Sequence, residues 1–190
     1  MSDLLIFDDG GGQFGPLTEM RSVVSLRTGA VTTLERIERT LGRFASGFIV
    51  PNSAAGPLRA RVSVRVNEPA SKPALCVSGR WWGVGELPDL GLSQAAMVGE
   101  AVLAAKLLPE DADAFTQSCK LPEHVERVAV EDTLYCRPWD ILTHLPEVLA
   151  VDLACAELPS PSVEPATLVG EHPAHIDESA LVFPGVVLDT

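Results

Sequence analysis

The sequence predicts an α/β domain with a mostly parallel sheet, and three observations support that class. Over the first 158 residues, short apolar runs that suit strands alternate with stretches of helical periodicity, which is the pattern of α/β domains. A proline-rich stretch at residues 158–165 then changes the composition of the chain and is typical of a semi-rigid linker. The 190 residues suffice for one medium domain and a short extra piece.

The first predicted strand is a continuous apolar run at residues 4–7. Because the run is apolar on both faces, it is expected in the centre of a parallel sheet, where helices cover both sides. Asp8 and Asp9 end the run, and residues 10–18 are expected to form a loop. A buried strand therefore leads directly into a loop that begins with three consecutive glycines.

The first predicted helix covers residues 32–41. Leu34, Ile37 and Leu41 share one face of this helix, and Gly42 supplies a stop signal. A helix of this kind is expected to pack its apolar face on the sheet.

Five further strands are predicted from apolar runs or apolar–polar alternation between turn residues: residues 47–50, 58–66, 74–77, 125–130 and 133–135. Residues 94–108 are apolar around Gly99 and predict a strand or a strand pair rather than a helix. Two more helices are expected at residues 109–119 and 138–158, the second with Pro138 in its first turn.

The residues after the proline-rich stretch divide into sixes that begin at Ile176, Val182 and Leu188. An aliphatic residue opens each six, as in the hexapeptide repeat of a parallel β-helix. One rung cannot bury its apolar face alone, so we expect the chain to be part of a longer protein. An ordinary C-terminal strand is the alternative. The predicted organisation is a domain at residues 1–158, a linker at 159–175 and the start of a β-helix at 176–190.

The formal net charge of −12 argues against nucleic acid or an anionic membrane as a partner, because both repel an acidic chain. No segment reaches the ~18 apolar residues of a membrane span, and the N-terminus lacks the basic region of a signal peptide. Four cysteines without a C-x-x-C pair predict reduced thiols in a cytoplasmic protein: Cys76, Cys119, Cys136 and Cys155.

The glycine loop fits two kinds of phosphate site. Gly10, Gly12 and Gly15 have the spacing of the dinucleotide fingerprint, but that fold needs a helix that starts at once. Here a Pro-Leu-Thr motif follows at residues 16–18, and no helix N-terminus is expected at the loop. The sequence therefore disfavours a Rossmann dinucleotide site and favours a loop whose backbone N–H groups bind phosphate.

Several short motifs occur in a fixed order along the chain: Phe7-Asp8-Asp9, Pro16-Leu17-Thr18, Arg21, Leu26-Arg27-Thr28-Gly29 and Arg137-Pro138-Trp139-Asp140. In these motifs the sequence resembles a divergent subfamily of the sugar-phosphate nucleotidyltransferases, whose members carry a left-handed β-helix after the transferase domain. They are generally labelled as similar to N-acetylglucosamine-1-phosphate uridyltransferase or glucose-1-phosphate thymidylyltransferase. The hexapeptide pattern independently supports this pairing of domains.

The resemblance implies a Rossmann-like nucleotidyltransferase domain with a mostly parallel sheet, followed by the first rung of a left-handed parallel β-helix. It implies transfer of a nucleotidyl group from UTP or dTTP to a sugar 1-phosphate, with a product of the UDP-N-acetylglucosamine or dTDP-glucose type. Mg²⁺ is the implied cofactor. The implied partners are the nucleoside triphosphate and the sugar 1-phosphate, and the full-length protein is expected to be a homotrimer.

The resemblance also assigns site residues. Those expected to bind the nucleotide are Gly10, Gly11, Gly12, Gln13 and Thr18. The better-known transferases place a lysine after Pro-Leu-Thr, and Arg21 and Arg27 are expected to replace it as the catalytic cations. Gly79 and Arg80, at the end of a predicted central strand, are expected to bind substrate.

The expected metal ligands are less regular. Arg80 stands where those enzymes place a metal-binding aspartate, which leaves Asp8, its neighbour Asp9, and Asp140 as Mg²⁺ candidates. Asp8 suits a turn cap equally well, and Asp140 suits the first turn of a helix, where the dipole favours an acidic residue. The alternative function is a catalytically weak or inactive domain that binds nucleotide or sugar phosphate and supports a C-terminal β-helical acyltransferase.

Overall fold

The computed structural model describes residues 2–19, 21–156 and 166–190. The chain divides into two compact units, Met1–Leu153 and Ala154–Thr190. Across the described residues, no helix combines the length and the apolarity that crossing a bilayer requires.

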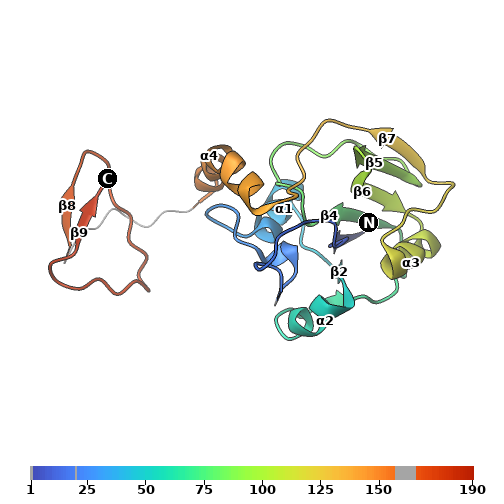
Figure 1. Ribbon diagram of the computed structural model, residues 1–190, viewed down its shortest axis with the longest axis horizontal. Helices are drawn as coiled ribbons and strands as arrows, with labels where there is room; N and C mark the ends of the chain where they lie inside the picture. The colour runs from blue at the N-terminus through green and yellow to red at the C-terminus, as the bar shows by residue number, and fades with distance from the viewer. Residues whose placement is uncertain (1, 20, 157–165) are drawn as a thin grey trace. The chain divides into compact units, whose positions relative to one another are not determined.

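The larger unit is built on a seven-stranded sheet with the order β3-β2-β1-β4-β6-β5-β7 (Figure 1). Its strands are β1 (Asp3–Phe7), β2 (Gly47–Ile49), β3 (Arg65–Val66), β4 (Ala74–Ser78), β5 (Gln94–Val98), β6 (Ala101–Leu107) and β7 (Glu126–Ala129). All neighbouring pairs are parallel except that β6 runs antiparallel to β4 and β5. The prediction of an α/β domain with a mostly parallel sheet is confirmed.

The helices described in this unit are α1 (Thr33–Leu41), α2 (Asn52–Arg59), α3 (Pro109–Ser118) and α4 (Pro138–Ala154), with a 3₁₀ turn, η1 (Val23–Ser25). Leu4 and Ile6 of β1 belong to one apolar core, and Leu5 and Phe7 belong to another, because successive side chains of a strand point to opposite faces. Residues of α1 and α2 complete the first core, and residues of α3 complete the second. Helices therefore cover both faces of the sheet (Figure 1).

Two local predictions are confirmed in detail. Residues 94–108 form a hairpin of β5 and β6 that turns at Gly99, where φ is +59°. α1 begins with a capping box between Thr32 and Glu35 and ends at Gly42, which is left-handed with φ +62°, as a glycine C-cap commonly is.

The predicted strand at residues 58–66 is wrong. α2 extends to Arg59, and only β3, Arg65–Val66, is extended. Gly56 and Pro57 lie inside α2. Because this pair usually marks a turn, the sequence did not predict a helix here. The strand predicted at residues 133–135 is reduced to one isolated bridge between Trp81 and Leu134.

The smaller unit contains a parallel pair of strands, β8 (Thr167–Val169) and β9 (Val187–Asp189), with Leu168 opposite Leu188. β8 lies inside the range predicted as a linker. The first part of that linker, residues 159–165, lies outside the described residues.

Candidate functional site

The candidate site begins where the two central strands end. β1 and β4 are parallel neighbours, and Phe7 is opposite Ser78, so the residues that follow each strand emerge side by side. The Gly79 N–H donates to the Phe7 carbonyl at 2.7 Å. A methyl group at Gly79 would lie 2.3 Å from Cγ1 of Val24, so this crossing requires glycine. The pairing brings Asp8 and Asp9 next to Arg80.

The Asp8 carboxylate holds the glycine loop in place through hydrogen bonds. Its Oδ1 accepts the Gly10 N–H at 3.0 Å, and its Oδ2 accepts the Ser22 hydroxyl at 2.7 Å and the Val23 N–H at 3.1 Å. The residue is only 8% exposed. Both carboxylate oxygens therefore join the glycine loop to the segment after Pro-Leu-Thr, which is the turn-capping role weighed from the sequence.

Asp9 holds Arg80. The Arg80 Nε donates to Oδ1 of Asp9 at 3.0 Å, and its Nη2 donates to Oδ2 at 2.6 Å. Oδ1 also accepts the Gly11 N–H at 2.9 Å. The Arg80 side chain is 4% exposed. Burial opposes its charge, but the hydrogen bonds and the charge of Asp9 outweigh burial and raise the pKa of Arg80 above its usual value.

A cavity of about 170 Å³ lies over this pair of strand ends. It gathers six of the predicted site residues: Asp8, Gly10, Gly12, Thr18, Arg21 and Arg80. Arg21 is exposed and has no hydrogen-bond or ion-pair partner among the described residues. Its guanidinium is therefore available to a ligand.

The start of α2 also lines the cavity, although the sequence did not predict this helix. Pro51, Ser53 and Ala54 line the cavity, and the Cβ position of Gly10 is 3.7 Å from Cγ of Pro51. The first N–H groups of a helix carry its positive dipole end. Those of Ala54 and Ala55 donate to the Pro51 carbonyl, which leaves the N–H groups of Asn52 and Ser53. As predicted, no helix starts directly after the glycine loop; the helix N-terminus at the cavity comes instead from α2, farther along the chain.

Several of the loop amides are occupied. The Gly10 and Gly11 N–H groups donate to the aspartates before them, and the Gln13 N–H donates to the Cys136 carbonyl at 2.7 Å. Of the two glycines that line the cavity, Gly10 and Gly12, it is Gly12 whose N–H has no partner in the described structure. A methyl group there would lie 2.1 Å from the Phe14 ring. Gly12 is thus the amide that a phosphate group can use.

Five predicted site residues lie outside this cavity lining: Gly11, Gln13, Arg27, Gly79 and Asp140. The Arg27 guanidinium donates to the Ala30 carbonyl on an exposed turn. Asp140 accepts the N–H groups of Cys136 and Arg137, each at 2.8 Å, at the start of α4. Gly79 and Gln13 support the cavity through backbone contacts without lining it.

A buried network explains another of the sequence motifs. Arg36 donates to Asp152 through Nε at 2.7 Å and Nη2 at 2.9 Å, and both side chains are 1% exposed. Its Nη1 donates to Oγ1 of Thr28 and to the Trp82 carbonyl. Gly29 packs against the same pair, since a methyl group there would lie 2.4 Å from Oδ2 of Asp152. Thr28 and Gly29 therefore join α1 to α4.

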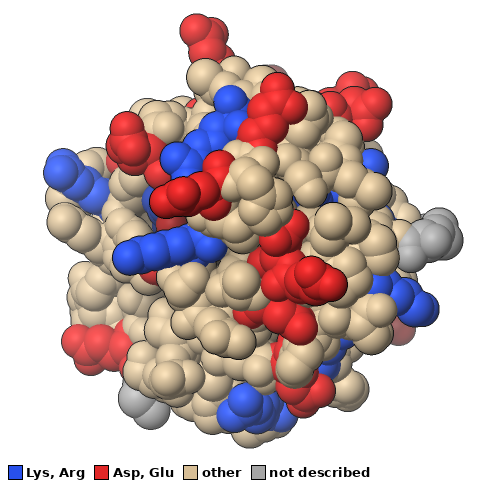
Figure 2. Space-filling view, turned by 90° about the vertical axis from the view of Figure 1, so that its right-hand side faces the viewer, with Lys and Arg blue, Asp and Glu red and all other residues tan. Residues whose placement is uncertain are grey.

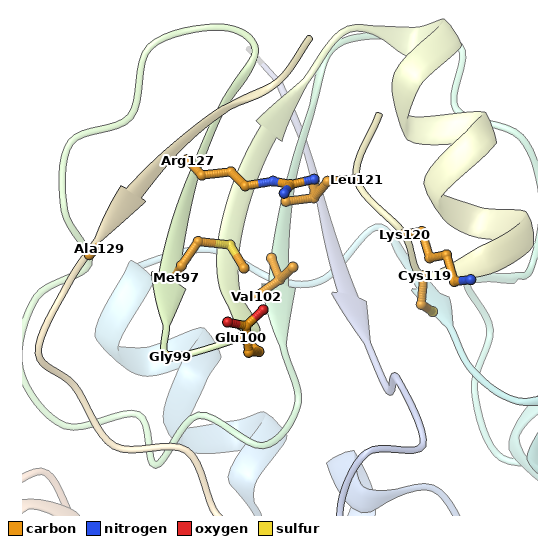
Figure 3. A pocket seen from close by; sticks show the side chains of 9 residues that line it. All are labelled: Met97, Gly99, Glu100, Val102, Cys119, Lys120, Leu121, Arg127 and Ala129. Atoms are coloured by element: carbon orange, nitrogen blue, oxygen red, sulfur yellow. The ribbon is translucent and has the colours of Figure 1, made fainter. Parts of the chain in front are cut away.

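A second, larger cavity of about 560 Å³ lies against β5, β6 and β7 (Figure 3). Met97 and Val102 contribute apolar surface, and Arg127 extends across the opening toward Leu121. It contains none of the predicted site residues, six of which line the smaller cavity. On the face in Figure 2, acidic side chains form a band across the middle, and basic side chains lie among them.

Cys119 lines the larger cavity and also contacts Asp8 of the candidate site. The Cys119 Sγ lies 4.0 Å from the Asp8 carbonyl oxygen. Burial, with the nearby charges of Asp9 and Asp8, raises the pKa of Cys119 to about 11. Its thiol is therefore protonated at neutral pH.

The sheet, its helices and the glycine loop at the ends of its central strands have the organisation of an α/β nucleotidyltransferase domain. The chain belongs to the sugar nucleotidyl transferase family, whose model matches residues 4–158. A comparison with curated proteins finds no match. Family membership identifies the general reaction as nucleotidyl transfer to a sugar, with a nucleotide and a sugar phosphate as the substrate classes.

Enzymes of this family often use Mg²⁺, and the donor atoms present here do not fit it. No group of three or more His, Cys, Asp or Glu side chains in the described part of the chain is arranged to hold a metal ion. Both oxygens of Asp8 accept hydrogen bonds, and both oxygens of Asp9 bind Arg80. Asp140 caps a different turn. The pair proposed from the sequence, Asp8 and Asp140, therefore offers no shared ion site.

Proposed function

We propose that the domain transfers a nucleotidyl group from UTP or dTTP to a sugar 1-phosphate, giving a product of the UDP-N-acetylglucosamine or dTDP-glucose type. The family supports the general reaction. The observation that carries the proposal is the cavity in which the glycine loop, Arg21, Arg80 and the start of α2 converge. Each of these groups favours a phosphate ligand.

The size of the cavity indicates which part of the nucleotide it holds. Small-molecule sites usually measure roughly 300–1,000 Å³, and this cavity measures about 170 Å³. It suits the phosphate chain, whereas the base and sugar extend beyond it. Gly12 N–H, Arg21 and the α2 N-terminus are the groups that bind and orient the phosphates.

In this reaction an oxygen of the sugar phosphate attacks the α-phosphorus in line, the bond to the β-phosphate oxygen breaks, and pyrophosphate leaves with the bonding electrons. The protein's part is to position the phosphates and to stabilise the charge that develops on them. Arg21 is the residue we assign to that charge, since its guanidinium is unpaired within the described chain.

The test is a turnover assay. The purified chain is incubated with UTP or dTTP, a panel of sugar 1-phosphates and Mg²⁺, and released pyrophosphate is measured. Arg21→Gln should lower kcat/KM roughly 10- to 150-fold, the equivalent of one charge-assisted phosphate contact. Arg61→Gln, an exposed arginine outside the cavity, is the matched control. Absence of turnover with every pair of substrates would refute the proposed reaction.

A second candidate function is supported by the poor fit to Mg²⁺. In it the domain binds a nucleotide or sugar phosphate without turnover and supports a β-helical acyltransferase farther along the chain. Titration calorimetry with the same substrates separates the two functions. Binding without pyrophosphate release supports the second candidate, and turnover excludes it.

For the smaller unit, we propose the first rung of a left-handed β-helix, after a transferase domain at residues 1–158 and a linker at 159–175. Parallel strands are usually joined through a helix, but residues 170–186 join β8 to β9 without one. A coil that returns directly beside itself is the unit of a β-helix. Such an assembly is proposed to be a trimer. Light scattering on the full-length protein tests this, and a monomer would contradict it.

A further inference from the structure

We infer that the Asp9–Arg80 pair takes the place of a divalent cation, so that nucleotide phosphates bind this chain without metal. The inference rests on the proposed phosphate cavity and concerns how that cavity supplies positive charge. Enzymes of the family commonly use Mg²⁺, but the carboxylates at this site already accept hydrogen bonds from the protein.

Arg80 lies against the glycine loop. It follows β4 at the strand end beside β1 and lines the phosphate cavity. Its Nη2 lies 3.2 Å from the Cβ position of Gly11, and its Cδ lies 3.2 Å from that of Gly12. The guanidinium is thus immediately behind the glycine loop, on the inner wall of the cavity. A fixed positive charge sits where the phosphates pass the loop.

Asp9 does not use all of the hydrogen-bond donors of Arg80. A guanidinium has five N–H groups, and Asp9 takes one from Nε and one from Nη2. Nη1 donates to the Tyr135 carbonyl at 3.4 Å, which is long, and to the Cys136 Sγ at 3.5 Å, which is ordinary for sulfur. One N–H on Nη2 has no partner among the described residues, and the contact to Tyr135 is weak. These are the Arg80 donors that remain for a phosphate oxygen.

Arg80 and a metal ion would compete for the Asp9 carboxylate, because both of its oxygens bind Arg80. An ion bound to Asp9 would have to displace the Arg80 guanidinium. The Arg80 side chain is 4% exposed, so it would become a buried cation without its carboxylate partner. It would also lie beside a second cation. Both effects are unfavourable. An ion on Asp8 would replace its three hydrogen bonds and detach the loop from Ser22 and Val23.

Asp9 is accordingly a positioning residue. Its bidentate contact fixes the plane of the guanidinium, and the same oxygen that accepts from Nε also accepts the Gly11 N–H at 2.9 Å. The loop and the cation are therefore held by one carboxylate. A ligand that contacts both finds them already arranged, which reduces the cost of ordering on binding.

The test on the unaltered chain is titration calorimetry with UTP and with dTTP, once with excess EDTA and once with saturating Mg²⁺. We expect the Kd in EDTA to be no more than threefold weaker than the Kd in Mg²⁺, because the protein's own cation is fixed in place. A loss of tenfold or more in EDTA overturns the inference and leaves the proposed function standing. An absence of binding in both buffers overturns the proposed function, and the inference with it.

Substitutions at the pair give a sharper readout. Arg80→Gln should weaken binding in EDTA at least tenfold and should make binding Mg²⁺-dependent, because Asp9 becomes available to a metal. The double variant Asp9→Asn/Arg80→Gln should remove that new dependence. Arg61→Gln should behave as the unaltered chain does. A folded Arg80→Gln variant, checked by its thermal unfolding, with unchanged affinity in EDTA would overturn the inference. If this variant fails to fold, the comparison of buffers on the unaltered chain remains decisive.

Discussion

Arg36→Met should destabilise the domain severely. The guanidinium makes four hydrogen bonds, two of them to Asp152, and neither side chain of the pair is more than 1% exposed. Removing it leaves the buried Asp152 carboxylate with backbone contacts only, from the Val31 N–H at 3.3 Å and from Ala30. Removing one partner of a buried pair costs roughly 3–5 kcal/mol. For a chain of this size that lowers Tm by roughly 6–20 °C.

The assay is urea and thermal unfolding followed by circular dichroism. Arg39→Met, an exposed arginine on the same helix, is the matched control and should change the unfolding free energy by less than about 0.5 kcal/mol. The double variant Arg36→Met/Asp152→Leu should recover most of the loss, because no buried charge remains. A cost below about 1 kcal/mol for Arg36→Met, or an equal cost in the double variant, would refute the reasoning.

The pair should also depend on pH. Burial raises the pKa of Asp152, but the hydrogen bonds and charge of Arg36 outweigh it, so the folded-state pKa lies below the ordinary value of 3.8. A lowered carboxylate pKa contributes stability above the unfolded-state value, and that contribution is lost as pH falls through the folded-state value. The stability difference between the unaltered chain and the Arg36→Met/Asp152→Leu variant should therefore shift in favour of the variant below about pH 4.

Three further predictions concern the site and its surroundings. Gly12→Ala should weaken UTP binding and cost about 1–3 kcal/mol of stability, measured by calorimetry and unfolding, because its Cβ would lie 2.1 Å from the Phe14 ring. Asp140→Ala should cost about 1 kcal/mol through the lost cap while nucleotide affinity changes less than threefold; a tenfold loss would identify Asp140 as a ligand instead. At pH 8, mass-spectrometric labelling with iodoacetamide should modify exposed Cys136 long before Cys76, whose pKa burial raises to about 12; equal rates would contradict its burial.

The central strands and the first helix could be predicted because their signals are local. Residues 4–7 are apolar without interruption, and α1 carries both a capping box and a glycine stop. The sequence did not predict α2 for a physical reason. Gly56 and Pro57 usually mark a turn, but here they lie within a helix. Missing α2 also meant missing the wall that Ser53 and Ala54 give to the cavity.

The roles of individual site residues were harder to predict, because they depend on partners far away in sequence. Thr28 and Gly29 help to carry the family resemblance, yet their contacts are to Arg36 and Asp152. Asp152 is 116 residues from Arg36, and no periodicity links the two. Nothing in the sequence around Arg80 names Asp9 as its partner either, although both were recognised as standing at strand ends.

The charges around the cavity determine how an acidic chain could bind a polyanion such as a nucleotide. Asp8 and Asp9 cancel the formal charges of Arg21 and Arg80, so the side chains at the cavity carry no net charge, and the whole chain carries −12. Long-range attraction therefore does not favour the proposed nucleotide binding. That proposed binding depends instead on short-range hydrogen bonds from Gly12, the two guanidinium groups and the first turn of α2, which act only at contact distance. The two aspartates then repel the ligand little, because their carboxylates are hydrogen-bonded to the loop and to Arg80. The carboxylates that first suggest a metal site are then the groups that hold the phosphate donors in place.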